Sequence, residues 1–147
     1  SRYVRPDEVP TDGRVRVIIG SYDGMTSPIE APAGITYLLV SLKDGERWTY
    51  VPSRDHEVAW MAVADGTALV DVALPRGEMI VFDEGSTPIE IVARGSTRFV
   101  IGSAKKHRHD LVLGNYSVHT SEDALAQGEA EILRIGKRLR ANGTLRR

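Results

Sequence analysis

The amino-acid sequence predicts a mostly β protein, an antiparallel barrel or sandwich followed by one C-terminal helix. Turn signals recur about every ten residues between positions 44 and 95, and short runs of strand-forming residues lie between them. No long helical period occurs before residue 120, which argues against a parallel α/β sheet. After residue 120 the apolar residues adopt helical spacing.

The β part is expected to begin after an extended lead-in over residues 1–14. Pro6 and Pro10 do not fit a helix there, and Asp12-Gly13 is a turn signal. Alternating or continuous apolar runs then predict strands over the ranges 14–22, 35–42, 46–51, 57–64, 67–73, 78–82, 88–93 and 97–104.

Two glycine dipeptides are predicted to be turns between these strands. Asp65-Gly66 is the strongest hairpin signal of the chain, because a two-residue turn of this type requires positive φ. Arg94-Gly95 is expected to form a second turn in the same way. Each dipeptide is therefore expected to end one strand and begin the next.

The C-terminal helix is predicted over residues 120–141. Thr120 is the expected N-cap, and Glu122 and Asp123 suit the first turn. Asn142-Gly143 is a stop signal. Apolar and small residues fall on one helical stripe, and these are Leu125, Gly128, Ile132, Ile135 and Leu139.

Length and composition limit the class of protein. A chain of 147 residues fits a single domain over 1–147, with its lead-in at 1–14, a β body at 15–118 and the helix at 120–141. A net charge of −1 provides no global basic field for nucleic acid. The absence of cysteine excludes disulfides, thiolate metal sites and cysteine nucleophiles. No apolar run reaches the ~18 residues of a membrane span, and we expect a cytoplasmic location without membrane partners.

Three of the four histidines, His107, His109 and His119, lie close together in the sequence. Such a cluster can bind zinc, iron or copper. The alternative is a charged loop, because the neighbouring Lys105 and Lys106 repel a divalent cation. We favour the loop.

A second candidate is the run Asp55, His56 and Glu57. A histidine flanked by carboxylates can act as a general base. Adjacent residues of a strand point to opposite faces, however, so the spacing alone does not bring the three together. We favour a polar loop that enters a strand.

Several stretches together resemble one family, the pirins. "VRVIIGSYDGMTSP" (15–28) resembles the opening of the second pirin domain, and "LPRGEMIVF" (74–82) resembles the turn and strand that close a cupin barrel. "GNYSVHTSEDA" (114–124) is similar to the segment that enters the last pirin helix, and "RANGTL" (140–145) corresponds to its basic end. The sequence departs from the pirin pattern at three positions, which are Asn115 for Pro, Ser117 for Val and His119 for Asn.

The resemblance implies a cupin-type antiparallel β-barrel or sandwich, an RmlC-like jelly roll. The cupin metal pattern then places its glutamate at Ala59 and its second-motif histidine at Ile80. The histidines of the first motif fall near Ser53 and Asp55, or near Pro52 and Arg54. None of these positions holds its ligand, as in the second barrel of two-domain pirins. The iron and the quercetin-oxidising activity of such pirins belong to the first barrel.

We therefore expect a metal-free, non-catalytic domain without a cofactor. Its expected partner is an N-terminal-type cupin domain or another protein, with self-association as a further option and no direct nucleic-acid partner. Two alternatives stay open. The chain could be a small-molecule enzyme with Arg54 and His56 at the mouth of a pocket, related to a quercetin-dioxygenase-like parent protein. It could also sense a ligand or dock a regulatory partner through the helix.

Overall fold

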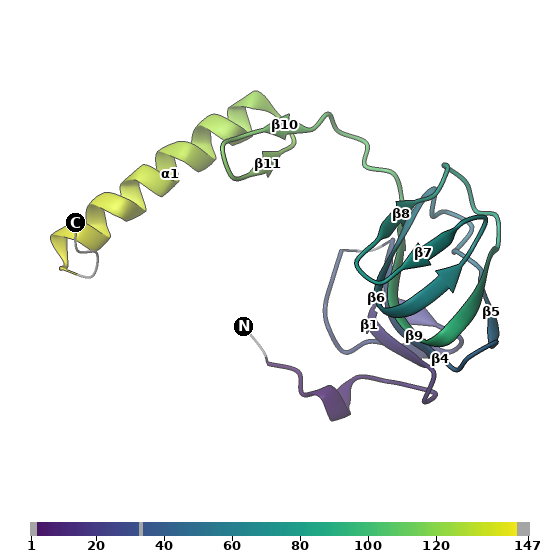
Figure 1. The fold of residues 1–147 in the computed structure, drawn as a ribbon. Helices are drawn as coiled ribbons and strands as arrows, with labels where there is room; N and C mark the ends of the chain where they lie inside the picture. Colours follow the sequence, from purple (N-terminus) through teal and green to yellow (C-terminus); the bar gives the residue numbers. More distant parts are fainter. Residues whose placement is uncertain (1–2, 33, 144–147) are drawn as a thin grey trace. The chain divides into compact units, whose positions relative to one another are not determined.

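The computed structural model describes residues 3–32 and 34–143, and the chain divides into two compact units, Ser1–Lys106 and His107–Arg147. Figure 1 shows strands β1 and β4 to β9 in the first unit, and β10, β11 and helix α1 in the second. The predicted fold class, mostly antiparallel β with one C-terminal helix, is confirmed. The last two residues of "RANGTL", Thr144 and Leu145, lie outside the described residues.

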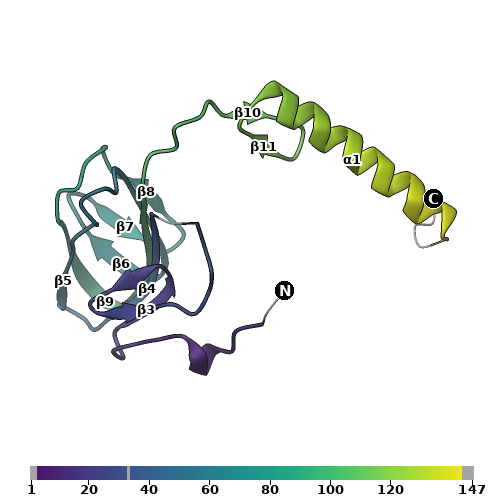
Figure 2. The same cartoon turned by 180° about the vertical axis from the view of Figure 1, so that it is seen from behind.

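The first unit contains one seven-stranded antiparallel sheet and a small hairpin. The sheet order is β1-β4-β9-β6-β7, and β5 and β8 pair with β9 and β6. The short β2–β3 hairpin follows β1, and β3 is visible in Figure 2. The elements are a short 3-10 helix (Pro6–Glu8), β1 (Val15–Ile19), β2 (Ser21–Tyr22), β3 (Met25–Thr26), β4 (Ile35–Leu42), β5 (Arg47–Tyr50), β6 (Val58–Leu69), β7 (Ala73–Pro75), β8 (Met79–Val81) and β9 (Ile89–Ala104).

The predicted turns at Asp65-Gly66 and Arg94-Gly95 are wrong, because β6 and β9 each run through them without interruption. Gly66 and Gly95 do adopt positive φ, +71° and +73°. They do so inside the strands, where the β6–β9 register shifts between Val63 and Thr67. A glycine with positive φ suits a β-bulge as well as a tight turn, so the dipeptide indicates the backbone conformation and does not decide between the two structures.

The bulges divide the sheet into two halves that share β6 and β9. Before its bulge, β9 pairs with β5, and after it β9 pairs with β4. The long strand β6 pairs with β8 before its bulge and with β7 after it. The two longest strands therefore belong to both halves and hold them together.

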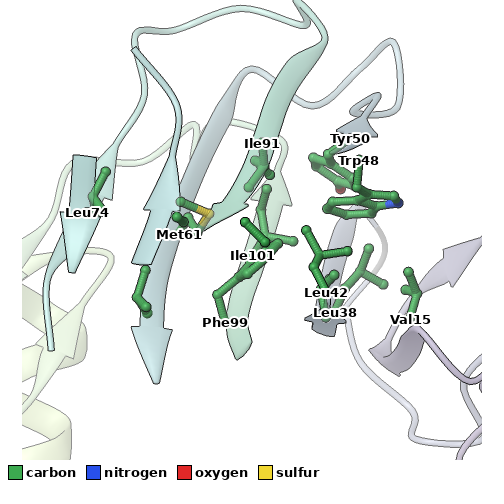
Figure 3. Close-up of a cluster of buried hydrophobic side chains, with 14 of the residues drawn as sticks. Val15, Leu38, Leu42, Trp48, Tyr50, Met61, Leu74, Ile91, Phe99 and Ile101 are labelled. Atoms are coloured by element: carbon green, nitrogen blue, oxygen red, sulfur yellow. The ribbon is translucent and has the colours of Figure 1, made fainter. Parts of the chain in front are cut away.

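A single hydrophobic core collects side chains from both halves. Trp48 of β5 packs on Phe99 in the other half of β9, with ring centroids 6.0 Å apart. Figure 3 shows Met61, Ile91 and Ile101 gathered in the same cluster. Each Å² of apolar area removed from water contributes about 25 cal/mol, so this cluster supplies the main stabilisation of the first unit.

The second unit contains β10 (Val112–Leu113), β11 (Val118–His119) and α1 (Glu122–Ala141). Ser121, one residue after the predicted cap, is the N-cap, and its Oγ accepts a hydrogen bond from the Ala124 amide at 3.2 Å. The His119 ring lies against Gly128 of the helix. No helix of the described residues is both long and apolar enough to cross a membrane.

We predict that Gly66→Ala destabilises the first unit more than Gly45→Ala. Both glycines have φ +71°, so each alanine carries a similar backbone cost of about 1–2 kcal/mol. A methyl group at Gly66 would also lie 2.4 Å from the Ser96 carbonyl oxygen, whereas Gly45 has no atom within 4 Å. We expect a further loss of about 1–3 kcal/mol for Gly66→Ala in urea unfolding. Equal losses in the two variants would contradict the close β6–β9 approach.

Candidate functional site

A chain of buried polar side chains crosses the interior of the first unit. The hydroxyl oxygen of Ser103 lies 2.7 Å from His56 Nδ1 and 2.7 Å from the Tyr50 hydroxyl oxygen. All three residues are at most 4% exposed. They come from three segments: His56 precedes β6, Ser103 lies near the end of β9, and Tyr50 ends β5.

Strand register places Ser103 at the centre of this chain. Ser103 alternates with Phe99 and Ile101 along β9, so it points to the same inner face as these core residues. Its partners in the neighbouring strands are Thr36 of β4 and Ala59 of β6. Thr36 is also buried, which extends the polar chain toward β4.

The chain is satisfied when all of its members are neutral. The Tyr50 hydroxyl can donate to Ser103 Oγ, and Ser103 can donate to Nδ1 of a neutral imidazole. Burial lowers the pKa of His56, and burial raises the pKa of the Tyr50 hydroxyl. Both shifts disfavour the charged forms, so these groups form a neutral network at pH 7.

A surface ion pair lies beside the network. Lys105 Nζ and Asp55 Oδ2 are 2.5 Å apart, and a hydrogen bond from Lys105 lowers the pKa of the Asp55 carboxyl. The Asp55 carboxylate favours a proton on His56 and the Lys105 ammonium disfavours it, so their effects oppose each other. Desolvation thus dominates the pKa of His56.

The residues predicted around His56 do not converge on it. Asp55 and Glu57 are exposed while His56 is buried, which agrees with the preference for a polar loop. Glu57 accepts a hydrogen bond from the Lys106 amide instead, at 3.3 Å. Arg54 lies in an exposed turn. A shared ligand pocket of Arg54 and His56 stays a prediction.

Two hollows lie near the network. One, of about 380 Å³, is lined by Tyr50 and Thr36 of the polar chain together with Ser53. The other, of about 490 Å³, is lined by Ala59, by the apolar residues Phe82 and Ile89, and by acidic residues at Asp71, Asp83, Glu84 and Glu90. Ala59 occupies the position of the predicted cupin glutamate.

The three clustered histidines form local contacts in the second unit. His107 Nδ1 lies 3.0 Å from the backbone oxygen of His109, and His119 Nε2 lies 2.9 Å from Ser117 Oγ. Within residues 3–32 and 34–143, no group of three or more His, Cys, Asp or Glu side chains is arranged to hold a metal ion.

Sequence reasoning missed Ser103 and Tyr50. A signal for Ser103 was present, because it is a polar residue at an inward position of the alternating strand 97–104. Tyr50 alternates with Trp48 in the same way. Their meeting with His56 depends on pairing between distant strands, which local patterns do not determine.

The fold of the chain is similar to that of known structures. A structure of quercetin 2,3-dioxygenase from Acinetobacter baumannii superposes with a TM-score of 0.79 at 14% identity, covering 89% of this chain and 48% of that chain. A second structure of that enzyme from the same organism gives a TM-score of 0.71 at 21% identity, covering 86% of this chain and 42% of that chain. The structure of GK1651 from Geobacillus kaustophilus gives a TM-score of 0.64 at 14% identity, covering 73% of this chain and 47% of that chain.

These similarities support the cupin-type fold, and this chain spans about half the length of each of these proteins. No protein-family model and no curated protein sequence matches the chain. The resemblance to pirins therefore stays a prediction.

We predict that His56→Asn reduces the loss of stability at acidic pH. Because burial lowers the pKa of His56 in the folded state, unfolding takes up a proton once the pH falls below the unfolded value of about 6.5. The free energy of unfolding thus decreases as the pH falls toward the lowered pKa, by about 1.4 kcal/mol for each unit of that lowering. Asparagine can keep a hydrogen bond to Ser103 without taking up the proton.

The measurement is urea unfolding between about pH 7.5 and pH 5, with the exposed His107→Asn as the matched control. The slope of the unfolding free energy against pH should be smaller for His56→Asn than for the parent and for His107→Asn. An unchanged slope for His56→Asn would show that His56 is not protonated more easily on unfolding.

Proposed function

We propose that this chain is a metal-free, non-catalytic cupin-type domain that packs against a metal-bearing cupin domain in a structural or regulatory role. One observation carries the proposal. Two of the four positions at which the cupin pattern has ligands hold hydrocarbon side chains that lie in the core or against it. Ala59 is 4% exposed, and Ile80 packs against the core cluster.

The other two ligand positions do not supply an alternative set. A methyl or sec-butyl group offers no electron pair to a metal ion, so Ala59 and Ile80 cannot ligate. Asp55 is exposed and its carboxylate is engaged by Lys105, while Ser53 is exposed as well. If the two histidine positions of the first motif are placed at Pro52 and Arg54 instead, neither residue type is a metal ligand in the cupin pattern.

The length of similar structures supports the proposed partner. This chain corresponds to about half of each quercetin 2,3-dioxygenase structure that it resembles. The other half of a two-domain protein is the natural candidate for a metal-bearing cupin domain, in line with the pirin resemblance. A cytoplasmic location belongs to the same proposal.

A small-molecule binding or enzymatic role is the second candidate. The hollow of about 490 Å³ favours it, because an apolar floor at Phe82 and Ile89 beneath polar groups is typical of ligand sites. Arg54 and His56 do not line this hollow. If the two residues act together as the sequence predicts, His56→Ala would abolish turnover of a small phenolic or acidic substrate, and circular dichroism would have to show that the variant stays folded.

We predict that the purified chain, dialysed and without a histidine tag, contains no stoichiometric metal by plasma mass spectrometry. The side chains of Ala59 and Ile80 are hydrocarbon and cannot ligate a metal ion. The variant His107→Ala/His109→Ala controls for ions that bind adventitiously to the exposed histidine pair. One molar equivalent of iron, zinc, copper or nickel that persists in this variant would contradict the proposal.

A further inference from the structure

Helix α1 has its charges divided between two halves. The acidic side chains all precede Arg134, and they are Glu122, Asp123, Glu129 and Glu131. The basic side chains all follow Leu133, and they are Arg134, Lys137, Arg138 and Arg140. The helix dipole explains acidic residues in the first turn and basic residues in the last turn, and no others. Glu129, Glu131, Arg134 and Lys137 lie in the middle turns, so their separation requires another explanation.

An apolar stripe runs along the same helix with the spacing of a coiled-coil seam. Leu125, Gly128, Ile132, Ile135 and Leu139 are separated alternately by three and four residues, which is the a/d pattern of a heptad. The β10–β11 hairpin covers the beginning of the stripe, where Leu125 lies close to Gly114 and Gly128 close to His119. Beyond the hairpin, Ile132 is 64% exposed.

The described residues of the second unit form no buried core. None of its described residues is buried. A unit of about 40 residues usually needs disulfides, metals or oligomerisation to fold stably on its own. The second unit has about this length and contains no cysteine. On the part of the stripe beyond the hairpin, Ile132 is exposed and Ile135 and Leu139 are partly exposed, so this part is expected to be covered.

We infer that α1 pairs in antiparallel orientation with α1 of a second copy of this chain, through the stripe Ile132, Ile135 and Leu139. Charge complementarity identifies the occupant. A helix with an acidic and a basic half is complementary to itself only when the two copies run in opposite directions. A two-fold axis then repeats the same favourable contact twice.

Three of the four cations of the basic half are available for this pairing. Glu131 is bound by Arg134 of its own helix, with N–O distances of 2.6 Å. Among the described residues, Lys137, Arg138 and Arg140 form no ion pair, and neither does Glu129. Glu131 and Arg138 each precede an a residue of the stripe, so they flank it on the same side. In the antiparallel pair, Arg138 of one helix therefore lies opposite Glu131 of the other. A parallel pair would place like charges together.

This interface goes beyond the proposed function, which concerns the first unit. The helix pairing and the proposed function can therefore fail separately. A chain without metal that is strictly monomeric would keep the proposed function and remove the helix pairing. A dimeric chain that holds stoichiometric metal would contradict the proposed function and leave the helix pairing in place.

Charge reversal on the full chain tests the pairing by sedimentation velocity over a concentration series. We expect the parent to self-associate. Glu129→Lys/Glu131→Lys and Arg138→Glu/Arg140→Glu should each raise the dissociation constant by about tenfold or more. An equimolar mixture of the two variants should restore association, because one helix is then basic and the other acidic. Circular dichroism checks that both variants keep the helix.

Two controls make the test specific. Ile132→Asp should weaken association, whereas Val72→Asp, which changes an exposed apolar residue of the first unit, should not. Because the chain has no cysteine, Glu131→Cys and Arg138→Cys can report orientation. Under oxidation, the mixed disulfide should form in preference to either symmetric one.

Three results would overturn the inference. A monomeric parent at every concentration would mean that something other than a second copy covers the stripe. Association that Val72→Asp weakens as much as Ile132→Asp would assign it to the β body. Preferential symmetric disulfides would indicate a parallel pair.

Discussion

The pairing of β6 with β9 is the constraint on which the first unit depends. These strands form the middle of the sheet, and every other strand of the sheet except β1 pairs with one of them. Their bulges at Gly66 and Gly95 allow both strands to change partners along their length, so that one sheet has two halves around one core. A side chain at Gly66 would meet the backbone of β9, and the close approach therefore depends on its absence.

The polar network is a consequence of that pairing. The register that places Ser103 opposite Ala59 also turns it inward, into reach of His56 and Tyr50. Leaving any of these groups without a partner in the interior would cost about 1–3 kcal/mol, so the three stabilise the fold as a set. Burial keeps His56 and Tyr50 neutral, and the interior of the β body thus holds neither a fixed charge nor a ligand set in its described residues.

Local chemistry predicted much of the fold and little of the network. Alternation located the strands 35–42 and 97–104 correctly, and the acidic first turn and the stop signal located the helix to within two residues. Asp65-Gly66 failed because positive φ serves a bulge as well as a turn. The meeting of His56 with Ser103 could not be predicted, because it joins residues 47 positions apart through strand register. The sequence also does not show which histidines are buried. His56 is buried in the first unit, whereas His107 and His109 are exposed.

The two units differ in how they satisfy the same physical requirement. The first unit buries aromatic and aliphatic residues in its own core, and this burial stabilises it. No described residue of the second unit is buried, and its helix instead carries an apolar stripe together with separated charges. Exposed apolar patches mark interaction sites, and separated charges restrict the orientation that a covering surface can take. In the proposed helix pairing, recognition therefore depends on the arrangement of charge along α1.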